Sequence, residues 1–500
     1  MKKETSRRQF LQIGAAAGSA VLTSTFRATA QTAAPSGPRR NVIFILIDDQ
    51  RYDAMGFMGH PFLKTPHLDA LAGNGIVFEN AFVTTSLCSP SRASILTGTY
   101  AHRHGVLDNS TLLPQDLTTF PQLLQRSGYT TAFIGKWHMG GSSDAPQPGF
   151  DHWVSFRGQG VYKNPQLNVN GKVVKREGYI TDLLTDYAEE FLGRPHEKPF
   201  FLYLSHKAVH GEFVPAERHK GCYADAVYPH PDSMADMEEN YRGKPAWVRA
   251  QRNSWHGVDG MYNKTIDFDA FARDYAETMR GVDVSVGRIV GALGGRGLLD
   301  STLILYTSDN GFQFGEHGLI DKRTMYEPSI RVPLIAHCPE LSPQGRRRTE
   351  MIINLDFAPT ILETAGVSIP GFVQGQPFLK LLRGESAPWR DAFLYEYFWE
   401  RSFPQTPTVL GVRTDRYKYM KYHGLWDRYE LYDIQQDTHE MNNLLGGFLQ
   451  ANEGGTLEGL IRQKADSGLR QLFNDMQDRL DRLLRETGCR EEPAWTMSKP

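Results

Sequence analysis

Asn41-Val42-Ile43-Phe44-Ile45-Leu46-Ile47, followed directly by Asp48-Asp49-Gln50, decides the fold. The run is apolar without interruption, which indicates a segment that is buried on both faces. Such runs are typical of strands in a parallel sheet that is covered by helices on both sides. The two acidic residues then stand at the carboxyl end of the strand, where ligands bind in sheets of this kind.

Three further apolar runs end in polar residues in the same way. They are Thr130–His138, Phe200–Ser205 and Thr302–Thr307, the last of which leads into Ser308-Asp309-Asn310-Gly311. Amphipathic segments that we expect to be helices lie between the runs, at 120–127, 182–192 and 271–293. The alternation of strand and helix predicts an α/β fold built on a large, mostly parallel sheet sandwiched by helices.

The N-terminus is expected to be a targeting segment. Ser6-Arg7-Arg8-Gln9-Phe10-Leu11 is a twin-arginine pattern, the apolar run after it is short for a membrane span, and Ala28-Thr29-Ala30 offers a cleavage site. We predict that residues 1–30 are a Tat signal peptide that directs a folded bacterial protein through the Tat export machinery. The mature protein would be periplasmic or secreted, with no stable membrane anchor; the alternative is an anchor helix preceded by arginines by chance.

Charge and cysteine content limit the function classes. The 500 residues carry a formal net charge of −2, so a global basic field is absent and general nucleic-acid binding is excluded. An anionic substrate must then be met by a local cluster of positive charge. The four cysteines lack C-x-x-C spacing, which disfavours zinc and redox motifs but leaves open one disulfide among Cys222, Cys338 and Cys489.

The segment from Cys88 to Gly98, C-S-P-S-R-A-S-I-L-T-G, places a thiol just before an expected helix. We expect Ser89 to cap this helix and Pro90 to occupy its first turn. Arg92 should lie beside Cys88, because residues four apart share a helix face, and the helix N-terminus adds positive potential. The pattern predicts a nucleophile at an anion-binding position. The alternative is a small buried cysteine at the start of an ordinary helix.

Oxygen donors at two strand ends predict a metal site. Asp48, Asp49, Asp309 and Asn310 offer hard oxygen ligands without sulfur or imidazole, which favours calcium or magnesium over zinc. Three acids packed together would repel one another unless a cation neutralised them. The alternative is that these are ordinary turn residues.

Together these motifs resemble the type I, formylglycine-dependent sulfatases of the alkaline-phosphatase-like superfamily, over about residues 40 to 445. The segments that carry the resemblance are Cys88–Gly98, Gly135–Gly140, Ser205–Gly211 and Gly315–Lys322. The resemblance implies that a formylglycine-generating enzyme, which reads C-x-P-x-R, oxidises Cys88 to Cα-formylglycine. It also implies one divalent ion per chain, Ca²⁺ in preference to Mg²⁺, held by Asp48, Asp49, Asp309, Asn310 and the modified Cys88.

The resemblance further assigns catalytic roles. Lys136 and Lys322 would bind the sulfate oxygens, His210 would protonate the leaving oxygen, and His138 would act as a base when the aldehyde re-forms. The complete predicted catalytic set is Cys88, Arg92, Lys136, His138, His210 and Lys322. Lys136 and His138 are two apart in an expected strand and should share a face. Singly, a lysine is usually solvated surface and a histidine a hydrogen-bonded bystander; their convergence on strand ends favours the site.

Substrate and function follow from a narrower resemblance. Pro148–Trp153, Leu167–Lys172 and Glu430–Asp433 resemble a branch that includes N-acetylglucosamine-6-sulfatases and related polysaccharide sulfatases. We therefore predict a sulfuric ester hydrolase acting on a sulfated glycan. Two alternatives are a phosphonate or phosphate monoester hydrolase of the same superfamily and a non-catalytic glycan-binding relative.

The domain organisation is predicted from composition and from the same resemblance. A glycine- and proline-rich stretch at 371–377 suggests a boundary between a catalytic domain at 38–375 and a C-terminal α+β subdomain at 376–490. The subdomain is expected to hold a small antiparallel sheet, from strands at 392–398, 409–413, 417–422 and 429–434, with a packed helix at 469–485. We expect one of two roles for Phe398, Trp399 and Arg401, either bordering the pocket or packing in a core. The segment at 216–268 is either a rim that selects the glycan or a plain surface insertion.

Overall fold

A computed structural model describes residues 39–261, 267–342, 345–424, 429–449 and 457–489. Its centre is a ten-stranded sheet, and the order of the strands is β13-β2-β12-β9-β1-β8-β4-β5-β6-β7. The bounds are β13 Arg346–Arg348, β2 Ile76–Phe78, β12 Leu334–His337, β9 Leu303–Ser308, β1 Val42–Ile47, β8 Phe200–Ser205, β4 Thr130–Lys136, β5 His152–Phe156, β6 Gln166–Val169 and β7 Lys172–Lys175. The predicted signal peptide at 1–30 lies outside the described residues.

The five central strands are parallel, which confirms the predicted fold class. β1 pairs with β8 on one side and with β9 on the other, with Ile45 opposite both Leu204 and Tyr306. β12, β6 and β7 pair antiparallel with their neighbours and give the sheet its mixed edges. The hairpin between β6 and β7 turns at Asn170-Gly171, both with positive φ, as expected for a two-residue turn.

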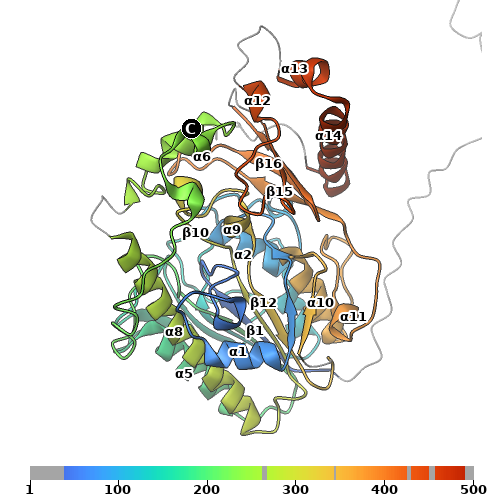
Figure 1. Ribbon diagram of the computed structural model, residues 1–500. Helices are drawn as coiled ribbons and strands as arrows, with labels where there is room; N and C mark the ends of the chain where they lie inside the picture. Colours follow the sequence, from blue (N-terminus) through green and yellow to red (C-terminus); the bar gives the residue numbers. More distant parts are fainter. Residues whose placement is uncertain (1–38, 262–266, 343–344, 425–428, 450–456, 490–500) are drawn as a thin grey trace, which may run out of the picture.

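Alternate residues of β1 enter two different cores. Ile43, Ile45 and Ile47 pack under α5 (Ile180–Gly193) and α8 (Phe268–Gly294). Val42, Phe44 and Leu46 pack under α2 (Cys88–Thr97), α4 (Phe120–Arg126) and α10 (Phe357–Thr364). Figure 1 shows α5 and α8 side by side on one face of the sheet. This burial on both faces is the reason that the strand is apolar at every position.

A second, four-stranded antiparallel sheet lies at the C-terminal end. Its order is β15-β16-β17-β18, with bounds Ala392–Tyr397, Val409–Thr414, Tyr417–Tyr422 and Tyr429–Asp433. α14 (Ser467–Thr487) packs on it through one stripe of buried residues, Phe473, Met476, Leu480 and Leu484. In Figure 1 this sheet and helix sit together above the main sheet. The secondary structure agrees with the predicted α+β subdomain, whereas its limits stay a prediction.

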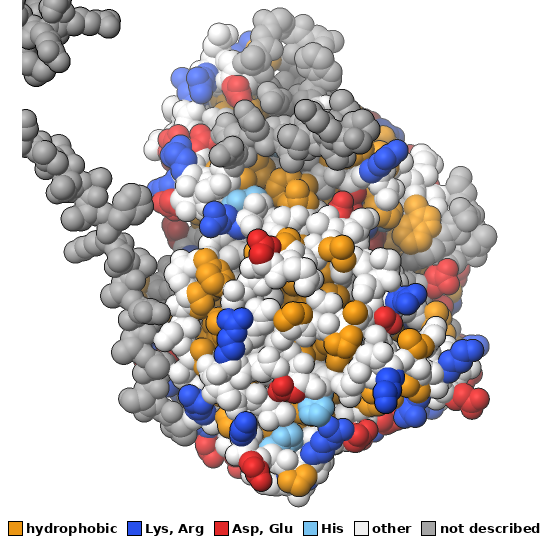
Figure 2. All heavy atoms as spheres, turned by 180° about the vertical axis from the view of Figure 1, so that it is seen from behind, with side chains coloured by type: hydrophobic (Ala, Val, Ile, Leu, Met, Phe, Trp, Pro, Cys, Tyr) orange, Lys and Arg blue, Asp and Glu red, His pale blue; other side chains and the backbone are white. Residues whose placement is uncertain are grey.

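Three general properties of the described residues complete the description of the fold: the distribution of charge, the character of the helices and the pairing of cysteines. Basic and acidic side chains are interspersed over the face seen in Figure 2, so no broad area of one charge stands out on the described part of that face. Within the described ranges, no helix has both the length and the apolar character that crossing a membrane requires. All four cysteines lie within the described residues and no disulfide joins any two of them, so the disulfide left open by the sequence is absent from this structure.

Candidate active site

The predicted acidic residues meet at the carboxyl edge of the sheet. β1 and β9 are neighbours with Ile47 opposite Ser308, so the residues that follow the two strands emerge side by side. The backbone N–H of Asp49 donates to Asp309 Oδ1 over 3.1 Å. One oxygen from each of Asp48, Asp49 and Asp309 lies within 4.8 Å of the other two, and all three residues are buried.

Asn310 completes the oxygen cluster. Its side-chain nitrogen donates to Asp49 Oδ1 over 2.7 Å and to Gly311 O over 2.8 Å, which fixes the orientation of the amide. Asn310 Oδ1 is then buried without a hydrogen-bond partner. A buried carbonyl oxygen without a partner is costly, and three carboxylates beside it form a hard-oxygen set. The residues present therefore fit a calcium or magnesium ion.

Burial and neighbouring charges split the pKa values of the carboxyl groups. Burial raises the pKa of Asp49 to about 7 against the opposing charge of Lys322, and burial with the charge of Asp48 raises the pKa of Asp309. Burial alone would also raise the pKa of Asp48, but the charges led by that of Lys136 hold it well below its usual range. A cation among these groups would favour their ionised forms.

Cys88 is the first residue of α2, and its thiol points to this acidic cluster. Cys88 Sγ donates to Asp48 Oδ1 over 3.5 Å, and Lys136 Nζ lies 3.9 Å from the sulfur. Burial raises the pKa of the Cys88 thiol, so the unmodified residue is protonated and is a poor nucleophile. Pro90 lies in the first turn as predicted, but the prediction that Ser89 caps the helix is wrong. The capping position is Leu87, and the Ser89 hydroxyl instead donates to the carbonyl of His138.

Arg92 links α2 to the ends of four strands, β9, β1, β4 and β8. Its Nε donates to Asp309 Oδ2 over 2.9 Å, and its Nη2 lies 3.5 Å from Asp48 Oδ2. Its Nη1 donates to Lys136 O over 2.7 Å and to Ser205 Oγ over 2.8 Å. The guanidinium is 2% exposed, so these contacts are formed out of water and position the acidic cluster rigidly.

Each of the two lysines contacts a different carboxylate of the acidic cluster. Lys136 Nζ contacts Asp48 Oδ2, and Lys322 Nζ contacts Asp49 Oδ1. Both ammonium groups are buried with their partners. The structure thus brings Lys322, which is far along the chain and lies between β11 (Ile320–Asp321) and α9 (Glu327–Ile330), to the same cluster as Lys136 at the end of β4.

The two predicted histidines differ in exposure, with His138 buried and His210 partly exposed. His210 Nε2 is 3.8 Å from Asp49 Oδ2, and its side chain is 18% exposed. His138 is not in the strand, because β4 ends at Lys136 and His138 has a φ of 57°. The expectation that Lys136 and His138 share a strand face is therefore wrong. Burial and the positive charge of Lys136 lower the pKa of both imidazoles, which are neutral in this environment.

Sequence reasoning missed other polar groups of the site. Lys136 Nζ also donates to Gln159 Oε1, which follows β5, and Lys207 follows β8 and is only 4% exposed. Asp321 lies 3.7 Å from Lys322 Nζ and pairs with Arg323. Each follows or ends a strand, so position after a buried strand is the signal that would have identified them.

The described part of the segment at 216–268 packs against β11, which precedes Lys322. The N–H of Ile320 donates to His256 O over 2.7 Å, and His256 Nδ1 lies 3.0 Å from Asp321 Oδ2. The His256 ring packs on Phe403 with centroids 4.6 Å apart. Trp399 is 43% exposed, which places it at the surface rather than in a core. Part of this insertion therefore forms a wall beside Lys322.

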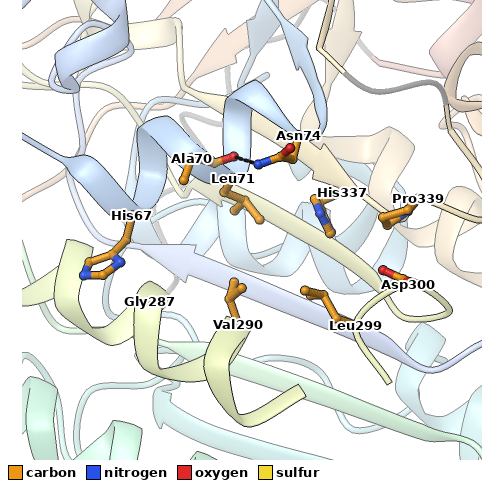
Figure 3. A pocket seen from close by; sticks show the side chains of 10 residues that line it. All are labelled: His67, Ala70, Leu71, Asn74, Gly287, Val290, Leu299, Asp300, His337 and Pro339. Atoms are coloured by element: carbon orange, nitrogen blue, oxygen red, sulfur yellow. Dashed lines mark hydrogen bonds between the residues drawn. The ribbon is translucent and has the colours of Figure 1, made fainter. Parts of the chain in front are cut away.

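A separate cavity of about 290 Å³ lies between α1 (Pro66–Gly73), α8 and the end of β12 (Figure 3). His337, which lines it, pairs with Ile304 near the start of β9, so this cavity is at the edge of the sheet opposite Asp309. The lining residues are His67, Ala70, Leu71, Asn74, Gly287, Val290, Leu299, Asp300, His337 and Pro339. The set contains no predicted catalytic residue, so the cavity is distinct from the site.

Comparison with known proteins agrees with this geometry. The sulfatase family model matches residues 40–367, and a model of the N-sulphoglucosamine sulphohydrolase C-terminal region matches residues 315–461. The N-acetylglucosamine-6-O-sulfatase of Bacteroides thetaiotaomicron is 35% identical over 486 residues, covering 85% of this chain and 86% of the relative. The chain belongs to the sulfatase family and is a sulfuric ester hydrolase.

Solved structures share the fold. One of them is a protein in complex with its substrate, D-glucosamine-2-N,6-O-disulfate; it has 31% sequence identity and a TM-score of 0.80, and covers 92% of this chain and 100% of that chain. The phosphonate monoester hydrolase of Agrobacterium radiobacter has a TM-score of 0.71 at 22% identity, covering 89% of this chain and 96% of that chain. At that identity the second likeness concerns the fold alone.

Proposed function

We propose that this chain removes sulfate from O6 of glucosamine residues in a sulfated glycan, with Cys88 as the reacting position. The observation that carries the proposal is the position of Cys88 Sγ, 3.5 Å from Asp48 Oδ1 and 3.9 Å from Lys136 Nζ, among acidic and basic groups that suit a sulfate ester. The 35% identity to an N-acetylglucosamine-6-O-sulfatase supports the choice of sugar.

Maturation precedes activity in this proposal. A formylglycine-generating enzyme converts Cys88 to formylglycine, whose hydrate offers one hydroxyl to attack sulfur and a second through which the sulfate is released. Asp48, Asp49, Asp309, Asn310 and the modified Cys88 would hold one calcium ion, which would neutralise the carboxylates and polarise the oxygen at position 88. The buried thiol with a raised pKa supports the need for conversion.

The remaining residues bind and move protons. Lys136 and Lys322, each beside one carboxylate of the cluster, bind the sulfate oxygens, and Arg92 keeps the reacting position aligned. His210 donates a proton to the departing sugar oxygen, because a bound sulfate adds negative charge that favours the imidazolium. His138, neutral in the free site, accepts the proton of the second hydroxyl when sulfate leaves.

Recognition of the sugar is assigned to the wall beside Lys322. Asp321 and Arg323 flank Lys322 in sequence, and the insertion at 216–268 reaches them through His256. Carboxylate and guanidinium groups can bind sugar hydroxyls next to a sulfate held by Lys322. The insertion is thus proposed to select the glycan.

Export is proposed to follow folding. The Tat signal at 1–30 would carry the mature enzyme to the periplasm or the medium after cytoplasmic conversion of Cys88. Precursor isolated from the cytoplasm should already carry formylglycine; a precursor that holds only the unmodified thiol would contradict this order.

The test of function combines intact mass spectrometry with two assays on one preparation. We expect active protein to carry formylglycine at position 88 and to release sulfate from N-acetylglucosamine 6-sulfate. The phosphonate or phosphate monoester hydrolase alternative predicts faster hydrolysis of an aryl phosphonate or phosphate than of the sulfated sugar. Active protein that holds only the thiol would contradict the proposed chemistry.

A further inference from the structure

A buried lysine near the site is not used by the chemistry described above. Lys207 lies in the turn after β8, where the N–H of His210 donates to its carbonyl over 3.0 Å. The residue is 4% exposed. Among the described residues, the Lys207 ammonium has neither a hydrogen bond nor an ion pair, and its nitrogen lies 4.5 Å from the centroid of the Tyr162 ring.

The lack of an anionic partner is unusual for a lysine side chain with so little exposure. Charged groups that leave water are normally paired, because desolvation otherwise costs several kcal/mol or neutralises the group. Burial, with the charge of Lys136, lowers the pKa of Lys207 to about 8. A lysine kept in such a place without a carboxylate is suited to a ligand that brings the negative charge.

The surroundings of Lys207 place it at the reaction site. The turn that carries Lys207 is bonded to the acidic cluster, since the N–H of Asp48 donates to Ala208 O over 3.0 Å and the N–H of Val209 donates to Asp48 O over 2.7 Å. Both carboxylates already contact other lysines, Asp48 with Lys136 and Asp49 with Lys322. Lys207 is therefore the ammonium group of this cluster that has no carboxylate partner among the described residues.

The Lys207 side chain is held in position by its neighbours. The Tyr162 ring under the ammonium is itself 5% exposed, and the Tyr162 hydroxyl donates to His210 O over 2.7 Å. The same tyrosine stacks on Tyr179 with centroids 5.8 Å apart. The aromatic face stabilises the cation without neutralising it, so an anion can still bind.

We propose that the Lys207 ammonium binds an anionic oxygen of the substrate, located on the sulfate that is hydrolysed or on a second acidic group of the same glycan. The proposal rests on the proposed function of the Cys88 site. It makes Lys207 a third anion-binding lysine there, contributed by the turn that also carries His210.

The experiment compares Lys207→Met with the exposed control Lys220→Met, with Lys207→Arg as the variant that keeps the charge. The substrates are 4-nitrophenyl sulfate, with one anionic group, and D-glucosamine-2-N,6-O-disulfate, with two. We expect Lys207→Met to lower kcat/KM by about tenfold or more, as for the loss of a charged hydrogen bond, and Lys207→Arg to restore part of it. A loss on both substrates assigns the contact to the hydrolysed sulfate, and a loss on the disulfate alone assigns it to the second group.

Thermal unfolding with inorganic sulfate separates binding from folding and does not require turnover. Lys207→Met should melt no lower than the parent enzyme, since it removes a poorly solvated charge without a carboxylate partner. Where Lys207 contacts the hydrolysed sulfate, the variant should also lose part of the stabilisation that added sulfate gives the parent. The role of Lys207 would be overturned if Lys207→Met matched the parent enzyme in kcat/KM on each of the two substrates and kept the full sulfate stabilisation. Failure of the proposed function would appear differently, as a parent enzyme that hydrolyses neither sulfate ester.

Discussion

The side-chain nitrogen of Asn310 donates a hydrogen bond to Asp49 Oδ1 over 2.7 Å, and this contact fixes which way the amide faces. As a result the amide oxygen of Asn310 is buried with no partner next to three carboxylates. Turned in this way, the amide oxygen can serve as a ligand for a cation, while the amide nitrogen donates a hydrogen bond to the neighbouring carboxylate of Asp49. The relationship leads directly to a prediction about metal binding.

Calcium added after chelation should raise the melting temperature of the protein. At a calcium concentration of 100 times Kd, binding to the folded state alone adds about 2.7 kcal/mol to the free energy of unfolding. Asn310→Ala should lose most of this increment, because it removes an oxygen ligand. The exposed control Asp116→Asn should keep it. An undiminished increment in Asn310→Ala would place calcium elsewhere.

Cys88→Ser should stop after a single sulfate transfer. A serine can attack sulfur, but it has no second hydroxyl through which to expel the sulfate, so the protein should remain covalently sulfated. Intact mass spectrometry after incubation with substrate measures the product. Cys222→Ser, at an exposed cysteine, should turn over normally. Sustained turnover by Cys88→Ser would contradict the proposed requirement for two hydroxyls.

Arg92→Ala should destabilise the fold by about 3–5 kcal/mol, because it leaves two buried carboxylates without their guanidinium partner. Arg92→Lys should also be costly, since a single ammonium cannot reproduce the four contacts of the planar group. Urea unfolding followed by circular dichroism measures both changes. Arg103→Ala, at an exposed arginine in the next helix, should stay within about 0.5 kcal/mol of the parent.

Stability should fall as the pH rises from about 6.5 to about 10 through the titration of His102. Burial alone would lower the pKa of this imidazole, but hydrogen bonds to Cys489 and Glu396 raise it to about 10. A group with a raised pKa in the folded state contributes fully below its unfolded value near 6.5 and loses that contribution as the pH approaches the folded value.

The His102 contribution has a structural basis and a direct test. Its Nδ1 lies 2.7 Å from Glu396 Oε2 in β15, and its Nε2 lies 3.1 Å from Thr487 O at the end of α14. His102→Gln should therefore flatten the decline of the free energy of unfolding over this pH range. A variant that retains the full decline would assign it to another group.

The secondary structure of the protein was largely predictable from its sequence. The run from Val42 to Ile47 is apolar at every position because both of its faces are buried, and this requirement is visible in a single strand. Because the carboxyl ends of parallel strands share one edge, the approach of Asp48 and Asp309 also followed from local patterns. The aromatic strands and the amphipathic α14 of the C-terminal part were predictable for the same reason.

Tertiary structure decided the details of the site that depend on distant parts of the chain. The turn that gives His138 a φ of 57° and draws the Ser89 hydroxyl to its carbonyl has no periodic pattern that would reveal it. Whether Lys207 has a partner depends on which carboxylates Lys136 and Lys322 already contact. Strand and helix periods are set by neighbours in sequence, whereas the pairing of buried charges is set by side chains that meet only after the sheet has assembled.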